Sequence, residues 1–136
     1  MNPSVEPNFC PEAEAQGAQK MTETQAQFIE SFNHMSGEAW RNAVHKGLRQ
    51  QGFERNIGEE IALAHSELSE ALEGVRAGNP QSSKIPEFTK AEAELADTVI
   101  RLMDTAFERG WRLAEAIIAK HEYNLTRPRK HGEKLF

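Results

Sequence analysis

The stretch "HSELSEALEG" at residues 65–74 places two glutamates, Glu67 and Glu70, three positions apart inside a helical pattern that Gly74 and Gly78 close. Around it, apolar residues recur at steps of three or four positions, which is the period of one helix face. The members of this apolar stripe are Ile57, Ile61, Ala64, Leu68, Leu72 and Val75. The pattern predicts an amphipathic helix whose stripe packs on the core. Glu67 would border the stripe, and Glu70 would lie one step further round.

Helical periodicity also precedes this stretch. A first helical region is expected over residues 22–50, with a break near Ser36-Gly37 and an end at Gly52. The central helix is expected to begin near Asn56, because Asn56 and Glu59 have the spacing of a capping box. The sequence therefore predicts one or two helices before the glutamate-rich helix.

Two further helices are predicted after it. The third begins at Thr89, which has capping-box spacing to Glu92, and ends at Gly110. Its apolar stripe consists of Leu95, Val99, Leu102 and Ala106. The fourth covers residues 113–125 and ends before Pro128. Strand signals are nearly absent, so the predicted fold class is all-α, a helical bundle of four to five helices.

The segment "AGNPQSSKIPEF" at residues 77–88 separates the second and third predicted helices. Its prolines, glycine and serines predict a loop. At about a dozen residues it is long for a connection between helices, which makes it a candidate lid or specificity loop. A surface loop without a function is the alternative.

Length and composition indicate one soluble domain. The chain has 136 residues, 27% of them charged and 38% hydrophobic. No apolar run approaches the roughly 18 residues of a membrane span. Residues 1–20 are rich in Pro, Glu, Gln and Ala and resemble a disordered tail rather than a secretory signal, which leaves residues 21–136 as the domain. The single cysteine, Cys10, permits no internal disulfide and is compatible with the cytoplasm, where we expect the protein. The net charge of −5 argues against a nucleic-acid polymer as partner.

A second pair of carboxylates, Glu94 and Asp97, has the same spacing of three on the third predicted helix. Residues three apart on a helix are neighbours, so two such pairs on facing helices could bring four carboxylates together. Such a group repels itself unless a cation binds, and Mg²⁺ prefers oxygen ligands. Two solvated helix faces are the alternative, in which Arg101 simply pairs with Asp97. Asp104 lies on a similar face and is expected to support the site or the structure.

The fourth predicted helix has a face that begins apolar and ends polar and cationic. Lys120, Asn124 and Arg127 continue the face of the preceding leucine and isoleucine, and Lys130 adds a further cation. Lysine, asparagine and arginine together suit phosphate oxygens. The alternative is a helix end whose long side chains reach water. Together with the carboxylates, this face suggests a site for phosphoryl chemistry.

These residues also resemble a known family. The segments "GEEIALAHSELSEALEG", "AELADTVIRLMD" and "AIIAKHEYNLTRPRKHG" are similar to the MazG-like all-α nucleoside triphosphate pyrophosphohydrolases over about residues 40–136. The signature would be Glu67 and Glu70 followed by Glu94 and Asp97, and the usual doubled glutamate that opens the first motif reads Ser66-Glu67 here.

The resemblance implies a function and an assembly. The expected reaction is hydrolysis of a nucleoside triphosphate to the monophosphate and pyrophosphate, with Mg²⁺, or Mn²⁺, and more than one ion per site. Glu67, Glu70, Glu94 and Asp97 would hold the metal, and Glu67 or Glu70 would accept the proton of the attacking water. The residues expected to bind the substrate are Lys120, Asn124, Arg127 and Lys130. The resemblance further implies a homodimer or homotetramer.

Other interpretations stay open at the level of sequence. Trp40 could stack on the nucleobase, or it could be a core residue. A phosphoribosyl-ATP pyrophosphohydrolase and a catalytically inactive helical interaction module are alternative functions. A di-iron carboxylate bundle is excluded, because it needs a histidine three positions after a glutamate and this chain has none.

Overall fold

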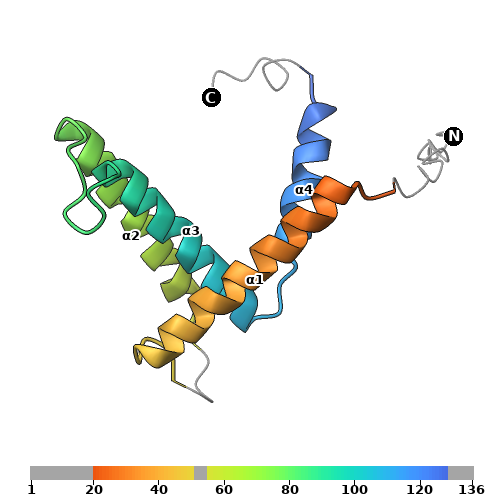
Figure 1. Cartoon of the computed structure of the whole chain (residues 1–136), viewed down its shortest axis with the longest axis horizontal. Helices are drawn as coiled ribbons and strands as arrows, with labels where there is room; N and C mark the ends of the chain where they lie inside the picture. The colour runs from red at the N-terminus through yellow and green to blue at the C-terminus, as the bar shows by residue number, and fades with distance from the viewer. Residues whose placement is uncertain (1–19, 51–54, 129–136) are drawn as a thin grey trace, which may run out of the picture.

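The structure is a computed structural model that describes residues 20–50 and 55–128, and over these residues it is all-α, with four helices packed as a bundle and no strand. The helices are α1 (Glu23–His45), α2 (Ile57–Arg76), α3 (Lys90–Glu108) and α4 (Leu113–Leu125). Figure 1 shows α2 and α3 side by side as an antiparallel hairpin, α1 crossing the end of α3, and α4 beside the first half of α1. The predicted fold class is confirmed. None of the described helices is long and apolar enough to span a membrane.

Two predictions concern residues that the structure does not describe. They are the disordered tail over residues 1–20, of which only Lys20 is described, and the phosphate-binding role of Lys130. These stay predictions. The predicted extent of the first helical region to residue 50, with an end at Gly52, is wrong, because α1 ends at His45 and residues 46–50 are not helical.

Local signals place the helix ends. Thr89 and Glu92 form the predicted capping box: the Thr89 hydroxyl accepts from the Glu92 N–H, and the Glu92 carboxylate accepts from the Thr89 N–H. The hydrogen bonds from the Thr89 side chain and backbone hold the pKa of Glu92 below its usual value. Asn56 caps α2 by accepting from the N–H groups of Gly58 and Glu59. Gly110 follows α3 with a φ of 62°, a conformation that glycine adopts without a steric cost.

The predicted break at Ser36-Gly37 is wrong, because α1 continues through both residues. The Ser36 hydroxyl donates to the carbonyl of Phe32 at 2.8 Å, which satisfies the hydroxyl inside the helix. A Cβ at Gly37 would lie 3.2 Å from Cε2 of Phe107 on α3. The small pair therefore marks the place where α1 and α3 approach closely.

Gly74 also lies where two helices approach closely, although it was predicted to end the helix that is now α2. α2 continues past it to Arg76, and a Cβ at Gly74 would lie 3.2 Å from Cγ of Lys90. Glycine at this position lets the end of α2 approach the beginning of α3.

The buried face of α2 differs from the predicted one. The apolar stripe is half exposed: Leu72 keeps 50% of its accessible surface and Val75 keeps 56%. The residues of α2 that are buried are Glu60, Ala64, Glu67, Ala71 and Gly74, so Ala64 is the one member of the predicted stripe among them. Small residues on this face allow α2 and α3 to pack closely, and the two glutamates enter the contact with them. The prediction that the leucine stripe packs on the core of the chain is therefore wrong.

The exposed stripes of α2 and α3 lie on one side of the hairpin. In both helices most residues of these stripes come one position after a buried residue, as Leu68 follows Glu67 and Leu95 follows Glu94. One position turns a helix by about 100°. Because the two helices are antiparallel, this turn points both stripes to the same side. We call this surface the apolar face; its residues are Ile61, Leu68, Leu72, Val75, Leu95, Val99 and Leu102.

The apolar core within one chain is correspondingly small. Among the described residues, the buried hydrophobic side chains are all alanines, and no large side chain is fully buried. The members of this core are Ala43, Ala64, Ala71, Ala91, Ala93, Ala106 and Ala114.

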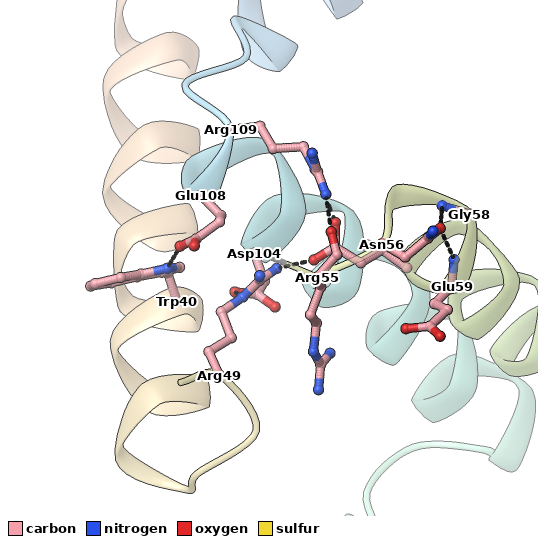
Figure 2. A network of polar contacts seen from close by, with 10 residues as sticks. Trp40, Arg49, Arg55, Asn56, Gly58, Glu59, Asp104, Glu108 and Arg109 are labelled. Atoms are coloured by element: carbon pink, nitrogen blue, oxygen red, sulfur yellow. Dashed lines mark hydrogen bonds and ion pairs between the residues drawn. The ribbon is translucent and has the colours of Figure 1, made fainter. Parts of the chain in front are cut away.

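A polar network joins the three helices at the end of the hairpin (Figure 2). Arg49, which follows α1 and is 4% exposed at its side chain, pairs with Glu60 of α2 at 2.8 Å and with Asp104 of α3 at 2.7 Å. Arg109 donates to the second oxygen of Glu60 at 3.0 Å and to the carbonyl of Arg55 at 2.7 Å. Burial lowers the pKa of Arg49, but the bond to Asp104 and the charge of Glu60 outweigh burial and raise it above its usual value.

Candidate metal centre

Three of the four predicted metal ligands come together between α2 and α3. Each of Glu67, Glu70 and Glu94 offers a carboxylate oxygen, and these oxygens lie within 4.8 Å of one another. Glu67 and Glu70 stand one helical turn apart on α2, and Glu94 faces them from α3. The helical spacing in the sequence and the antiparallel pairing of the helices together bring them to one place. This carboxylate triad could hold a metal ion.

Glu94 gives the triad its chemical character. The residue is 7% exposed, and its Oε2 is buried without a hydrogen-bond partner among the described residues. A buried carboxylate oxygen without a partner is costly, since desolvation is not offset by a hydrogen bond. Two further carboxylates beside it add repulsion. A divalent cation would relieve both costs, so the residues present fit a bound metal ion.

A pocket of about 350 Å³ opens beside the triad. Its lining includes Glu67, Glu70 and Asp97, so the fourth predicted ligand faces the same space without joining the close group. α1 closes one side with Ala39, Asn42 and Ala43. On the hairpin, Glu70 and Asp97 each follow a buried glutamate by three positions, which turns them away from the apolar face. The pocket and the apolar face therefore lie on opposite sides of the hairpin.

Arg101 lies within this pocket and pairs with Glu67 rather than with Asp97. Its Nε and Nη2 both approach Oε1 of Glu67 at 2.7 Å. The ion pair joins α3 to α2 and compensates one of the three negative charges of the triad. Spacing along one helix suggested Asp97 as the partner of Arg101, but the partner lies across the hairpin.

The cationic residues of the fourth helix lie elsewhere in the chain. α4 packs on the first half of α1 (Figure 1), where Gln25 donates to Glu122 at 2.7 Å. The pocket, in contrast, lies beside Asn42. At 1.5 Å per residue, these two positions of α1 are about 25 Å apart. Lys120 places its ammonium 4.8 Å from the ring centre of Tyr123. The structure therefore does not bring Lys120, or the exposed Asn124 and Arg127, to the carboxylates of the same chain.

Trp40 connects α1 to α3 on another side of the molecule. Its ring lies 5.5 Å from that of Phe107, and its indole N–H donates to the carboxylate of Glu108 (Figure 2). Trp40 is not among the described residues that line the pocket. Asp104 does line the pocket, while its carboxylate is held by Arg49, which agrees with the supporting role expected for it.

Two residues that line the pocket, Lys84 and Asn42, were not predicted as site residues from the sequence. Lys84 reaches the pocket from the loop between α2 and α3, and Asn42 reaches it from α1. A lysine in a loop with serines and prolines resembles any surface lysine. Only its position in space distinguishes it.

No family model, curated protein or solved structure matches this chain in a comparison with known proteins. What the structure establishes is a four-helix all-α protein with a largely buried acidic cluster.

Proposed function

We propose that this protein is a metal-dependent pyrophosphohydrolase that converts a nucleoside triphosphate to the monophosphate and pyrophosphate. The observation that carries the proposal is the buried Oε2 of Glu94 within the triad, which accepts no hydrogen bond from a described residue, because a metal ion would offset the charge that these carboxylates bring together. The resemblance of the carboxylate motifs to the MazG-like family supports the same reaction. The pocket beside the triad gives a substrate room to approach.

The roles of the glutamates follow from their surroundings. A bound Mg²⁺ or Mn²⁺ would polarise the phosphate and lower the pKa of a coordinated water. Glu67 is tied to Arg101, and Glu94 is buried, so both are held in place as ligands. Glu70 is exposed to the pocket and makes no ion pair with a described residue, which suits it to accept a proton.

In the proposed step, the oxygen of a water forms a bond to the α-phosphorus of the nucleotide. The bond from that phosphorus to the oxygen that bridges the α- and β-phosphates breaks, and pyrophosphate leaves. The proton of the water passes to Glu70. Asp97, which lines the same pocket from α3, would add a carboxylate for a second metal ion.

The direct test is release of pyrophosphate from a panel of canonical and modified nucleoside triphosphates, with phosphoribosyl-ATP included. The full chain is expected to be active with Mg²⁺ or Mn²⁺. The Glu70→Gln and Asp97→Asn variants are each expected to hydrolyse the substrate at least about a hundredfold more slowly than the wild type. Glu87→Gln, an exposed change in the loop, is the matched control. An inert wild-type protein with metal present would contradict the proposal and favour a binding module, and preference for phosphoribosyl-ATP would identify the alternative enzyme.

We further propose that the protein is a homodimer in which a second copy covers the apolar face. Soluble monomers rarely expose a contiguous apolar surface of this kind, and one chain alone buries only alanines as hydrophobic residues among those described. Burial of seven half-exposed aliphatic side chains on each copy would add the missing core. The pocket lies on the other side of the hairpin, so this contact leaves the carboxylates accessible.

A further inference from the structure

The loop between α2 and α3 is a folded element. Asn79 adopts a φ of 51°, and its side-chain oxygen accepts from the N–H of Ala91 at 3.0 Å. The N–H of Lys90 donates to the carbonyl of Pro80 at 2.7 Å, and the N–H of Ser82 donates to the carbonyl of Phe88 at 2.8 Å. The first two bonds attach the beginning of the loop to the first turn of α3, and the third joins the two sides of the loop to each other.

The inner turn of the loop is fixed by a buried serine. Ser82 is 7% exposed, and its hydroxyl accepts from the N–H groups of Lys84 and Ile85 at 3.2 and 3.3 Å. The backbone of Lys84 is therefore held directly, two residues from a buried anchor. From this position the Lys84 side chain lines the carboxylate pocket together with Glu70 and Asp97.

Lys84 differs from the other cation of the pocket. Arg101 is committed to Glu67, whereas Lys84 makes no ion pair with any described residue. A lysine held beside carboxylates without pairing with them keeps its three N–H donors for another anion. The cationic face of α4 lies about 25 Å away along α1 and does not compensate charge at this pocket within one chain.

We infer that Lys84 is a polyphosphate-binding residue of this pocket, donating to phosphate oxygens of a metal-bound nucleotide or pyrophosphate. The inference rests on the proposed function for its natural ligand. A polyphosphate brings several negative charges next to the triad and Asp97, and metal ions offset only part of that repulsion. An ammonium group on a loop whose backbone is held by hydrogen bonds adds a positive charge at this pocket.

The test compares Lys84→Met and Lys84→Arg with Lys20→Met, an exposed lysine far along the chain from the pocket. The probe is inorganic pyrophosphate, titrated by calorimetry in saturating Mn²⁺, with Mn²⁺ affinity and thermal unfolding measured separately. Lys84→Met is expected to weaken pyrophosphate binding on the order of tenfold or more, since one charge-assisted bond is lost. Lys84→Arg and Lys20→Met are expected to bind like the wild type.

Mn²⁺ affinity and the melting temperature should not fall in Lys84→Met. Unchanged pyrophosphate binding would overturn the inference, as would a loss of Mn²⁺ binding and stability in parallel, because that result would show a structural role. A wild-type protein that binds no pyrophosphate would overturn it too. If pyrophosphate binding depends on Lys84 but no nucleotide is cleaved, the proposed reaction fails and the inference holds. If nucleotides are cleaved equally by Lys84→Met, the inference fails and the reaction holds.

Discussion

At the scale of single residues, Glu94 is the side chain with the most unusual surroundings. It was predicted to lie with Glu67, Glu70 and Asp97, and the structure places it with Glu67 and Glu70, while Asp97 lines the pocket beside them. Helical spacing alone could identify which carboxylates share a helix. It could not identify which of them meet, since the triad depends on how α2 and α3 are rotated against each other.

Glu94→Gln is expected to leave the metal-free protein at least as stable as the wild type, because one of three neighbouring negative charges is removed. The same change should abolish the rise in melting temperature that Mg²⁺ or Mn²⁺ gives the wild type. That rise corresponds to ~2.7 kcal/mol at a metal concentration one hundred times the Kd. Differential scanning fluorimetry with and without metal measures both effects, with Glu87→Gln as the control. A metal-induced rise that persists in Glu94→Gln would remove this residue from the site.

Arg49 and Glu60 form a residue pair that the sequence pattern did not indicate. Replacing Arg49 by Met leaves Glu60, whose side chain is 2% exposed, with Arg109 alone and leaves Asp104 without its partner. Breaking a buried ion pair is strongly destabilising, so the free energy of unfolding is expected to fall by about 3 kcal/mol. Urea unfolding followed by circular dichroism measures this change. Arg76→Met, which breaks an exposed pair with Glu73, should cost less than ~1 kcal/mol. Equal losses in the two variants would show that the buried network does not stabilise the fold.

At the scale of elements, the sequence was most informative where the signal is local. The fourth helix was predicted at its observed bounds, and the caps at Asn56 and Thr89 act on the helices they begin. The prediction failed at Ser36-Gly37, because a small pair can break a helix or can admit a neighbouring helix, and the sequence of one helix does not distinguish these uses. Which side of an amphipathic helix is buried within the chain is likewise decided by its neighbours.

Gly37→Leu tests the close approach of α1 and α3. A Cβ at this position already lies 3.2 Å from Phe107, so a larger side chain must push the helices apart. The free energy of unfolding is expected to fall by about 1–2 kcal/mol, because the overpacking costs more than the higher helix propensity of leucine contributes. Ser31→Leu, at an exposed position of the same helix, is the matched control and should not destabilise. Thermal unfolding that is the same for both variants would mean that α3 does not limit the size of residue 37.

At the scale of the whole molecule, the apolar face is the surface on which the proposed dimer rests. The wild type is expected to sediment as a dimer and to melt at a temperature that rises with protein concentration, because subunit association stabilises the folded state. Leu72→Glu, in the middle of the face, should give a monomer with a lower melting temperature. Leu125→Glu, on α4 at 73% exposure, is the control and should stay dimeric. A wild-type protein that sediments as a monomer at every concentration would contradict the dimer.

The α2–α3 hairpin also has a consequence for the order of folding. The three glutamates of the triad lie on two consecutive helices joined by a hydrogen-bonded loop, so the contacts between these helices are closer in sequence than those that α1 makes with α3. Local contacts form early, since they need little loop closure. We therefore expect the repulsion among Glu67, Glu70 and Glu94 to act while the hairpin assembles. On this expectation, charge at the carboxylates affects the rate at which the chain folds, and a divalent ion that bound them would affect that rate as well as the stability of the folded state.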